Sequence, residues 1–129
     1  MEKEDYLRVM YSLLLEKKQI KSVDIASNLK ISKPSVSEML KKLSKLKLIK
    51  INPYSKVKFT SQGLKQARQI AHHHKTINKF AKHILKHNKF QSLKLAHELE
   101  HLSPLTIEKL NKFMDELHKP ASKMPSYIG

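Results

Sequence analysis

The chain contains no cysteine, which excludes disulfide bonds and cysteine-ligated zinc sites. Glycine is nearly absent too: Gly63 and Gly129 are the only two among 129 residues, while 40% of residues are hydrophobic. A sequence so poor in glycine is expected to be mainly α-helical. No apolar run approaches membrane-spanning length, and Met1–Asp5 does not resemble the start of a signal peptide. We therefore expect a cytoplasmic protein with no membrane partner.

Acidic residues are scarce and unevenly placed. The chain has 26 basic and 11 acidic residues, a net charge of +15. Between Glu38 and Glu98 there is no acidic residue, whereas 14 lysines and Arg68 fall in that span. Such a field attracts polyanions, of which nucleic acid is the commonest. The excess of lysine over arginine could partly reflect an A/T-rich genome, so charge alone only suggests a class of partner.

Two short helices joined by a tight turn are predicted after a first helix over residues 5–17. Ser22 should cap the first of the two, and Ser32 should precede the second, which begins near Lys33 with Pro34 in its first turn. Their apolar residues recur at helical spacing, with a small alanine, Ala26, where the helices would cross. This arrangement is typical of a helix-turn-helix.

A β-hairpin is predicted directly after this motif. Leu48–Ile51 and Lys56–Phe59 are β-prone segments, and the turn-forming residues Asn52–Ser55 separate them. Thr60 should then cap a long helix that reaches about Ile84. A hairpin in this place is a wing, so we expect residues 1–71 to form a winged-helix DNA-binding domain.

The remaining chain is predicted to be helical and to pair with a second copy. One helix should start at Ser92 and contain the pentapeptide His97–His101, and another should start at Ser103-Pro104. Two short helices cannot build a large core alone, so their apolar faces are expected to close against a second subunit in a homodimer. We assign residues 72–118 to a metal-binding and dimerisation domain and residues 119–129 to a flexible tail.

Double-stranded operator DNA is the expected partner of the winged helix. The second helix of the motif enters the major groove with its N-terminal end, and lysines of that helix and of the wing should contact phosphates. The residues concerned are Ser32, Lys33, Pro34, Ser35, Ser37, Glu38, Lys41, Lys42, Lys56 and Lys58. None is an arginine, so we expect strong salt dependence, with part of the specificity coming from DNA shape.

The pentapeptide His97-Glu98-Leu99-Glu100-His101 allows two interpretations. As H-E-x-x-H it is the zinc-protease signature, in which Glu98 would be the general base. As H-x-x-E-H it offers His97, Glu100 and His101 as metal ligands, which a helix would present on one face. A solvent-exposed His-Glu face without function is the plain alternative. Two helices after a winged helix leave little scaffold for a substrate cleft, so we expect no enzyme and no small organic substrate.

Across residues 4–117 the chain resembles the metal-dependent repressors of the diphtheria toxin repressor and manganese transport regulator type. The matching segments are Glu4–Leu7, Val23–Ala26, Lys33–Ser37, Phe59–Gly63 and Ala96–His101. Each segment is unspecific alone, but their order and spacing together are specific.

The resemblance implies a metal site shared by the first helix and the dimerisation region. The implied ligands are Asp5, His97, Glu100 and His101, and His74 matches a ligand of a second site. This mixed set of nitrogen and oxygen donors suits Mn²⁺ or Fe²⁺ and would also accept Zn²⁺. His72, His73, His83 and His87 match no ligand position and are interpreted as structural or surface residues.

The chain departs from the family pattern at several positions. Arg8 stands where manganese-type members have a glutamate of the second site, and Asn78 where iron-type members have a glutamate. His97 replaces cysteine or glutamate, and one residue is missing between His101 and Ser103. The second site thus lacks part of its usual ligand set.

The resemblance implies a repressor of metal-uptake genes. A divalent cation would bridge the DNA-binding and dimerisation domains and thereby raise operator affinity. The alternative is a winged-helix regulator that does not sense metal.

Overall fold

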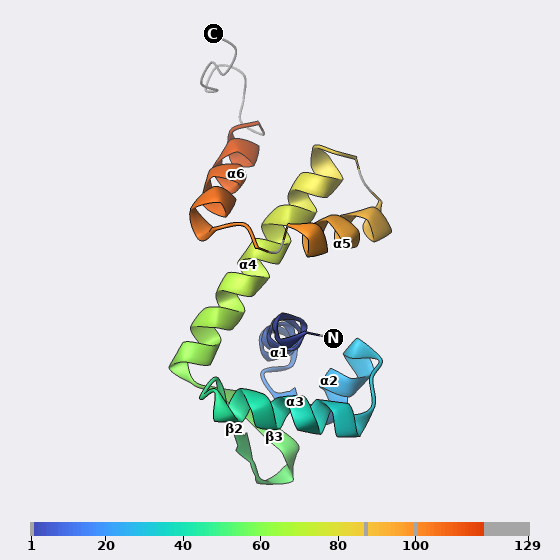
Figure 1. Cartoon of the computed structure of the whole chain (residues 1–129), viewed down its shortest axis with the longest axis vertical. Helices are drawn as coiled ribbons and strands as arrows, with labels where there is room; N and C mark the ends of the chain where they lie inside the picture. The colour runs from blue at the N-terminus through green and yellow to red at the C-terminus, as the bar shows by residue number, and fades with distance from the viewer. Residues whose placement is uncertain (1, 87, 100, 118–129) are drawn as a thin grey trace. The chain divides into compact units, whose positions relative to one another are not determined.

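The computed structural model describes residues 2–86, 88–99 and 101–117, and the chain divides into two compact units, residues 1–71 and 72–129 (Figure 1). Each unit has its own cluster of buried hydrophobic side chains. The long helix α4 (Ser61–His83) begins in the first unit and ends in the second. None of the helices in the described ranges combines the length and the apolar composition that a membrane span requires.

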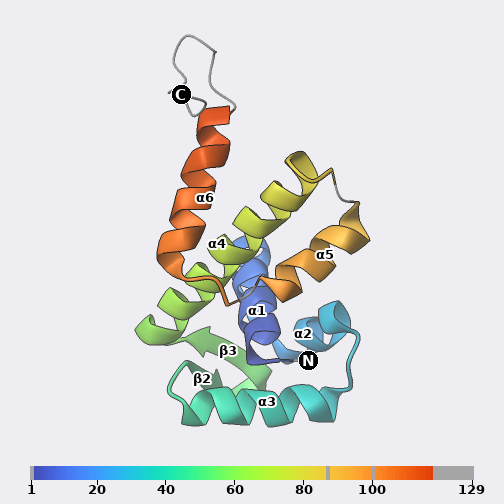
Figure 2. The ribbon, with the colours of Figure 1, turned by 45° about the horizontal axis from the view of Figure 1, so that its top comes forward.

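The first unit is a winged helix, as predicted. Three helices come first, followed by a small antiparallel sheet with strand order β1-β3-β2. The elements are α1 (Lys3–Lys17), β1 (Ile20–Lys21), α2 (Ser22–Leu29), α3 (Lys33–Lys45), β2 (Ile49–Asn52), the 3₁₀ turn η1 (Pro53–Ser55) and β3 (Lys56–Phe59). Figure 2 shows β2 and β3, the two strands of the wing, beside α3.

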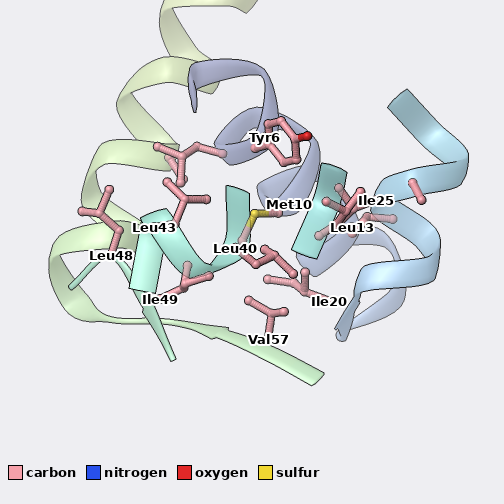
Figure 3. Close-up of a cluster of buried hydrophobic side chains, with 14 residues drawn as sticks. Tyr6, Met10, Leu13, Ile20, Ile25, Leu40, Leu43, Leu48, Ile49 and Val57 are labelled. Carbon is pink, nitrogen blue, oxygen red and sulfur yellow. The ribbon is translucent and has the colours of Figure 1, made fainter. Parts of the chain in front are cut away.

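The core of this unit ties the helix-turn-helix to the sheet. Side chains from α1, α2, α3 and all three strands meet in one cluster, as Figure 3 shows, including Met10, Ile25, Leu43 and Val57. Full burial of such a side chain contributes about 1.5–3 kcal/mol. Packing of this kind fixes the position of α3 relative to the wing.

The second unit contains the C-terminal part of α4 together with α5 (Lys89–Glu98) and α6 (Pro104–Leu117). Its buried cluster is small: Ile77, Ala96 and Ile107, with leucines 95, 99 and 102 packed around it. Two side-chain contacts join α4 to α6: a hydrogen bond between His72 Nε2 and Glu108 Oε1 at 2.6 Å, and an ion pair between Lys79 Nζ and Asp115 Oδ1 at 3.5 Å. A core of this size is consistent with a unit that needs further burial from a partner.

Three predicted helix starts are confirmed by side-chain caps. Ser32 Oγ accepts a hydrogen bond from the Ser35 amide at the start of α3. Thr60 Oγ1 accepts one from the Gly63 amide at the start of α4, and Ser103 Oγ accepts one from the Thr106 amide at the start of α6. Each satisfies a backbone donor that the helix itself leaves unpaired.

Other predicted boundaries were wrong. Ser22 is the first residue of α2 rather than its cap, because Ile20 and Lys21 form an unpredicted strand, β1, that pairs with β3. The helix predicted to start at Ser92 starts at Lys89, since Asn88 and Gln91 form a reciprocal capping box. Its end is earlier than predicted, at Glu98, so the pentapeptide does not lie on one helical face.

Lysine occupies left-handed backbone positions where glycine is usual. Lys18 has φ 61° at the C-terminal end of α1, and Lys30, Lys47 and Lys86 have φ values of 55–60°. A side chain in this conformation costs about 1–2 kcal/mol, whereas glycine adopts it without strain.

Replacing Lys18 with glycine should therefore raise the free energy of unfolding by about 0.5–1 kcal/mol. Part of the relieved strain is offset because glycine gains entropy in the unfolded chain. Glu16→Gly, two residues earlier inside α1, is the matched control and should lower stability by about 1 kcal/mol. Thermal unfolding of the full chain measures both, and a lower melting temperature for Lys18→Gly would contradict the assignment.

Candidate DNA interface and metal-ligating residues

The N-terminal end of α3 presents the residues predicted to contact DNA. Lys33, Pro34 and Ser37 are exposed to solvent. Ser32 and Ser35 are exposed too, but they are linked by a 2.9 Å hydrogen bond in which Ser32 Oγ donates to Ser35 Oγ. These two serines thus cap the start of the helix, and their side chains are also exposed at its surface. Glu38, Lys41 and Lys42 follow on exposed positions of the same helix.

Lysines also line the outer face of the sheet. In the ladder Lys58 lies opposite Lys50, and Lys56 lies opposite Lys21, so like charges face one another across the strands. Such pairs are destabilising unless a partner neutralises them. In the part of the chain that the structure describes, no carboxylate forms an ion pair with a lysine of α3 or of the sheet. The surface is therefore suited to an anion.

A groove runs between α3, the start of α2 and the wing. Three residues already predicted to contact DNA, Lys33, Ser37 and Lys41, line it. The other lining residues were not predicted to contact DNA; they are Lys21, Ser22, Val23, Val36, Leu40, Ile51 and Tyr54. The sequence indicates for Tyr54 only a place in the turn Asn52–Ser55. An aromatic residue next to a lysine-rich strand is the feature of the sequence that could have indicated a DNA contact at Tyr54.

Asp5 is the predicted metal ligand of the first unit, and it lies in the first turn of α1. Its Oδ2 accepts a hydrogen bond from the Glu2 amide at 3.0 Å, which completes a capping box at the start of the helix. Its Oδ1 lies 3.5 Å from Arg8 Nη2, in a partly exposed ion pair. Arg8 would therefore compete with a cation for this oxygen. Burial raises the pKa of the neighbouring Tyr6 hydroxyl above its ordinary value.

His74, the predicted second-site ligand, lies on α4 with its Nδ1 3.1 Å from the Asn78 side-chain amide. A metal-bound imidazole commonly donates its other ring N–H to an oxygen acceptor. Here the bond runs the other way: Asn78 Nδ2 donates to His74 Nδ1, so a neutral ring carries its proton on Nε2. Asn78 can thus orient His74, although it cannot supply the charge of the glutamate that it replaces.

The pentapeptide marks the end of α5. His97 is exposed in the last turn, Glu98 is the final helical residue, and His101 is exposed beyond the helix. His73 Nε2 lies 3.1 Å from the Leu99 carbonyl oxygen, and the Leu102 amide donates to the same carbonyl at 3.2 Å. His73 therefore has a structural contact that holds the end of α5 to α4. The zinc-protease signature needs both histidines on one helix, and this condition is not met.

Glu100, another predicted ligand, lies outside the described residues, as do His87 and residues 118–129. Among residues 2–86, 88–99 and 101–117, no three histidine or carboxylate side chains form a group able to hold a metal ion. The complete set of Asp5, His97, Glu100 and His101 thus stays a prediction. Its two carboxylates and two imidazoles are donors that fit Mn²⁺, Fe²⁺ or Zn²⁺.

Comparison with family models matches both units. Residues 1–57 match the model described as iron dependent repressor, N-terminal DNA binding domain. Residues 60–125 match iron dependent repressor, metal binding and dimerisation domain. The family consists of transcriptional regulators rather than enzymes, in agreement with the prediction.

Individual proteins similar to this chain are transcriptional regulators as well. An uncharacterised HTH-type transcriptional regulator of Methanocaldococcus jannaschii is 34% identical over 88% of this chain and 92% of its own length. The transcriptional regulator MntR of Salmonella typhimurium is 32% identical over 60% of this chain and 49% of its own. A solved structure of the manganese regulator SloR superposes with a TM-score of 0.75 at 31% identity, over 88% of this chain and 54% of that one.

The chain spans nearly the whole archaeal relative but only about half of MntR and of SloR. Two family models that together cover most of the chain, and a relative of matching length, agree with the winged helix and the helical second unit. The chain belongs to the iron-dependent repressor family, to which the MntR transcriptional regulators are related.

Proposed function

We propose that this protein is a dimeric, metal-responsive DNA-binding repressor whose affinity for its operator rises when a divalent cation binds. The carrying observation is the winged helix, whose lysine surface has no internal counter-ion in the described residues. The match of the second unit to a metal binding and dimerisation domain supports the metal response. The DNA-contacting residues that we propose are those of α3 and the wing predicted from the sequence.

The residues proposed to hold the cation are Asp5, His97, Glu100 and His101, with His74 at a second site. A bound cation would supply positive charge to two carboxylates and two imidazoles. Asp5 belongs to the DNA-binding unit and the other three to the second unit. A shared ligand set would restrict the movement of one unit against the other. By linkage, DNA binding must then tighten metal binding by the same factor.

Homodimerisation is supported by hydrophobic side chains that the second unit leaves exposed. Phe90 is 75% exposed and Leu105 is 66% exposed, in a unit whose own core is small. Burial of such side chains against a second copy would stabilise a symmetric dimer. A dimer would place two copies of α3 on two half-sites of an operator.

The regulated genes that we propose are those for metal uptake, because SloR is named as a manganese regulator. A protein that binds the chromosome in this way would act in the cytoplasm. No small organic substrate is required by this function.

Mn²⁺ or Fe²⁺ should strengthen binding of the full chain to its operator by roughly 5- to 150-fold. The probe is a duplex selected from a random pool in the presence of Mn²⁺, and fluorescence anisotropy measures its affinity. Chelator should reverse the gain. Mg²⁺, which binds histidine poorly, is the control and should give little effect. Equal affinity with Mn²⁺ and with chelator would instead support the regulator that does not sense metal.

A further inference from the structure

The groove between α2, α3 and the wing has an apolar interior. Val36 and Leu40 of α3 form part of its lining and are 1% and 4% exposed. Val23 of α2 and Ile51 of β2 also line it, and both stay about half exposed. Ile51 pairs with Val57 in the ladder, so it continues the apolar side of the sheet beyond the core. The unit thus leaves aliphatic surface open at its DNA-facing side.

Tyr54 also lines this groove, in the turn of the wing. Its side chain is 93% exposed, and its backbone lies in the left-handed region with φ 73° and ψ 26°. Glycine or asparagine would adopt this turn at lower cost. Because the ring is exposed, its packing within the unit does not compensate for the strain of the backbone. The same left-handed backbone occurs at Lys18, Lys30, Lys47 and Lys86, so it is the exposure of the ring, and not the strain, that indicates contact with a partner.

The charged part of the groove is purely basic. Lys21, Lys33 and Lys41 line it, and no acidic residue is among its lining residues. The nearest acidic residue in the sequence of α2, Asp24, pairs with Lys17 Nζ at 3.3 Å. An occupant must therefore be anionic and also present apolar surface. A nucleic acid strand has both properties, because phosphates alternate with the carbon faces of deoxyribose.

We infer that this groove holds one strand of the DNA backbone, with the lysines at phosphates and with Val23, Ile51 and Tyr54 against deoxyribose. The inference rests on the DNA binding of the proposed function and adds a non-ionic contact to it. Phosphate contacts weaken with salt because each releases condensed counter-ions, whereas apolar contacts do not. The contributions of the lysines and of the apolar residues to DNA affinity can therefore be separated by their dependence on salt concentration.

The test is the affinity of the full chain for a labelled 30-base-pair duplex of random sequence, measured at several NaCl concentrations. Tyr54→Ser and Ile51→Ser should each weaken binding about fivefold at every salt concentration, with an unchanged slope of log K against log salt. Lys41→Gln should make the slope shallower by about 0.9, the value for one phosphate contact. Leu46→Ser is the matched control, because Leu46 is 53% exposed in the same unit and does not line the groove.

Measurement with Mn²⁺ and again with chelator separates this inference from metal sensing, because the ratio of variant to wild-type affinity should be the same in both. The inference would be overturned if the groove variants bound DNA as tightly as the wild type. It would also be overturned if they lost no more DNA affinity than Leu46→Ser. A slope changed by Tyr54→Ser or Ile51→Ser would overturn it too. A wild-type chain that binds no DNA under either condition would refute the proposed function itself.

Discussion

Replacing Gly63 with alanine should destabilise the winged helix by about 3 kcal/mol or more. A Cβ atom on Gly63 would overlap the carbonyl oxygen of Leu48 and would lie 2.7 Å from the carbonyl carbon. Both are backbone atoms, so no side-chain rotation can relieve the clash. Either the first turn of α4 or the residues before β2 must move.

The displacement would also break the hydrogen bonds that join these two segments. The Thr60 amide donates to the Leu48 carbonyl at 3.0 Å, and Thr60 Oγ1 donates to the Lys47 carbonyl at 2.7 Å. The same hydroxyl caps α4 by accepting from the Gly63 amide at 3.0 Å. Loss of a cap alone costs about 1 kcal/mol, and buried groups left without partners add to it.

Chemical denaturation of the full chain, followed by circular dichroism, measures the effect. Gln62→Ala is the matched control, because Gln62 is exposed in the same helical turn and should change stability by less than about 0.5 kcal/mol. A free energy of unfolding for Gly63→Ala within about 1 kcal/mol of the wild-type value would contradict the close approach of α4 to Leu48.

The elements predicted correctly are those whose signals are local. Ser32 and Pro34 define the start of α3, and Thr60 defines the start of α4. The wing follows from two β-prone segments around a turn. A helix period, a cap and a turn each occupy a few consecutive residues, so the sequence displays them directly.

The errors lie where two local signals compete or where a distant contact decides. Asn88 and Ser92 both suit a cap, but Asn88 has Gln91 three residues later to complete the box, and Ser92 is buried within the helix. Strand β1 has only two residues and exists through its ladder with β3. The end of α5 has no glycine or proline nearby, and His73 contacts it from α4.

The predicted site shows the same division. The DNA-contacting residues of α3 could be named because a helix-turn-helix defines which end meets DNA. The residues added by the groove come from β1, α2, α3, β2 and the turn η1, which only the folded chain brings together. Asp5 and His97 are more than ninety positions apart, so only the family resemblance associated them.

Replacing Glu100 with alanine should abolish the metal-dependent gain in DNA affinity, whereas Glu98→Ala should leave that gain unchanged. The proposed ligand set uses Glu100 and not Glu98. Loss of one ligand leaves the cation with fewer donors, so its binding weakens. The metal-dependent increase in DNA affinity, roughly 5- to 150-fold in the wild type, should then disappear. Each variant removes one carboxylate from the same pentapeptide, so the two changes in net charge are identical and each variant is the control for the other.

Two measurements on the full chain decide between these glutamates: Mn²⁺ binding by calorimetry and DNA affinity with and without Mn²⁺. His97→Ala should behave like Glu100→Ala in both. Equal effects at Glu98 and Glu100 would indicate that the pentapeptide acts only through its charge, and a larger effect at Glu98 would contradict the ligand assignment. The protease signature cannot explain a Glu100-specific loss, because its catalytic glutamate is Glu98 and α5 ends before His101.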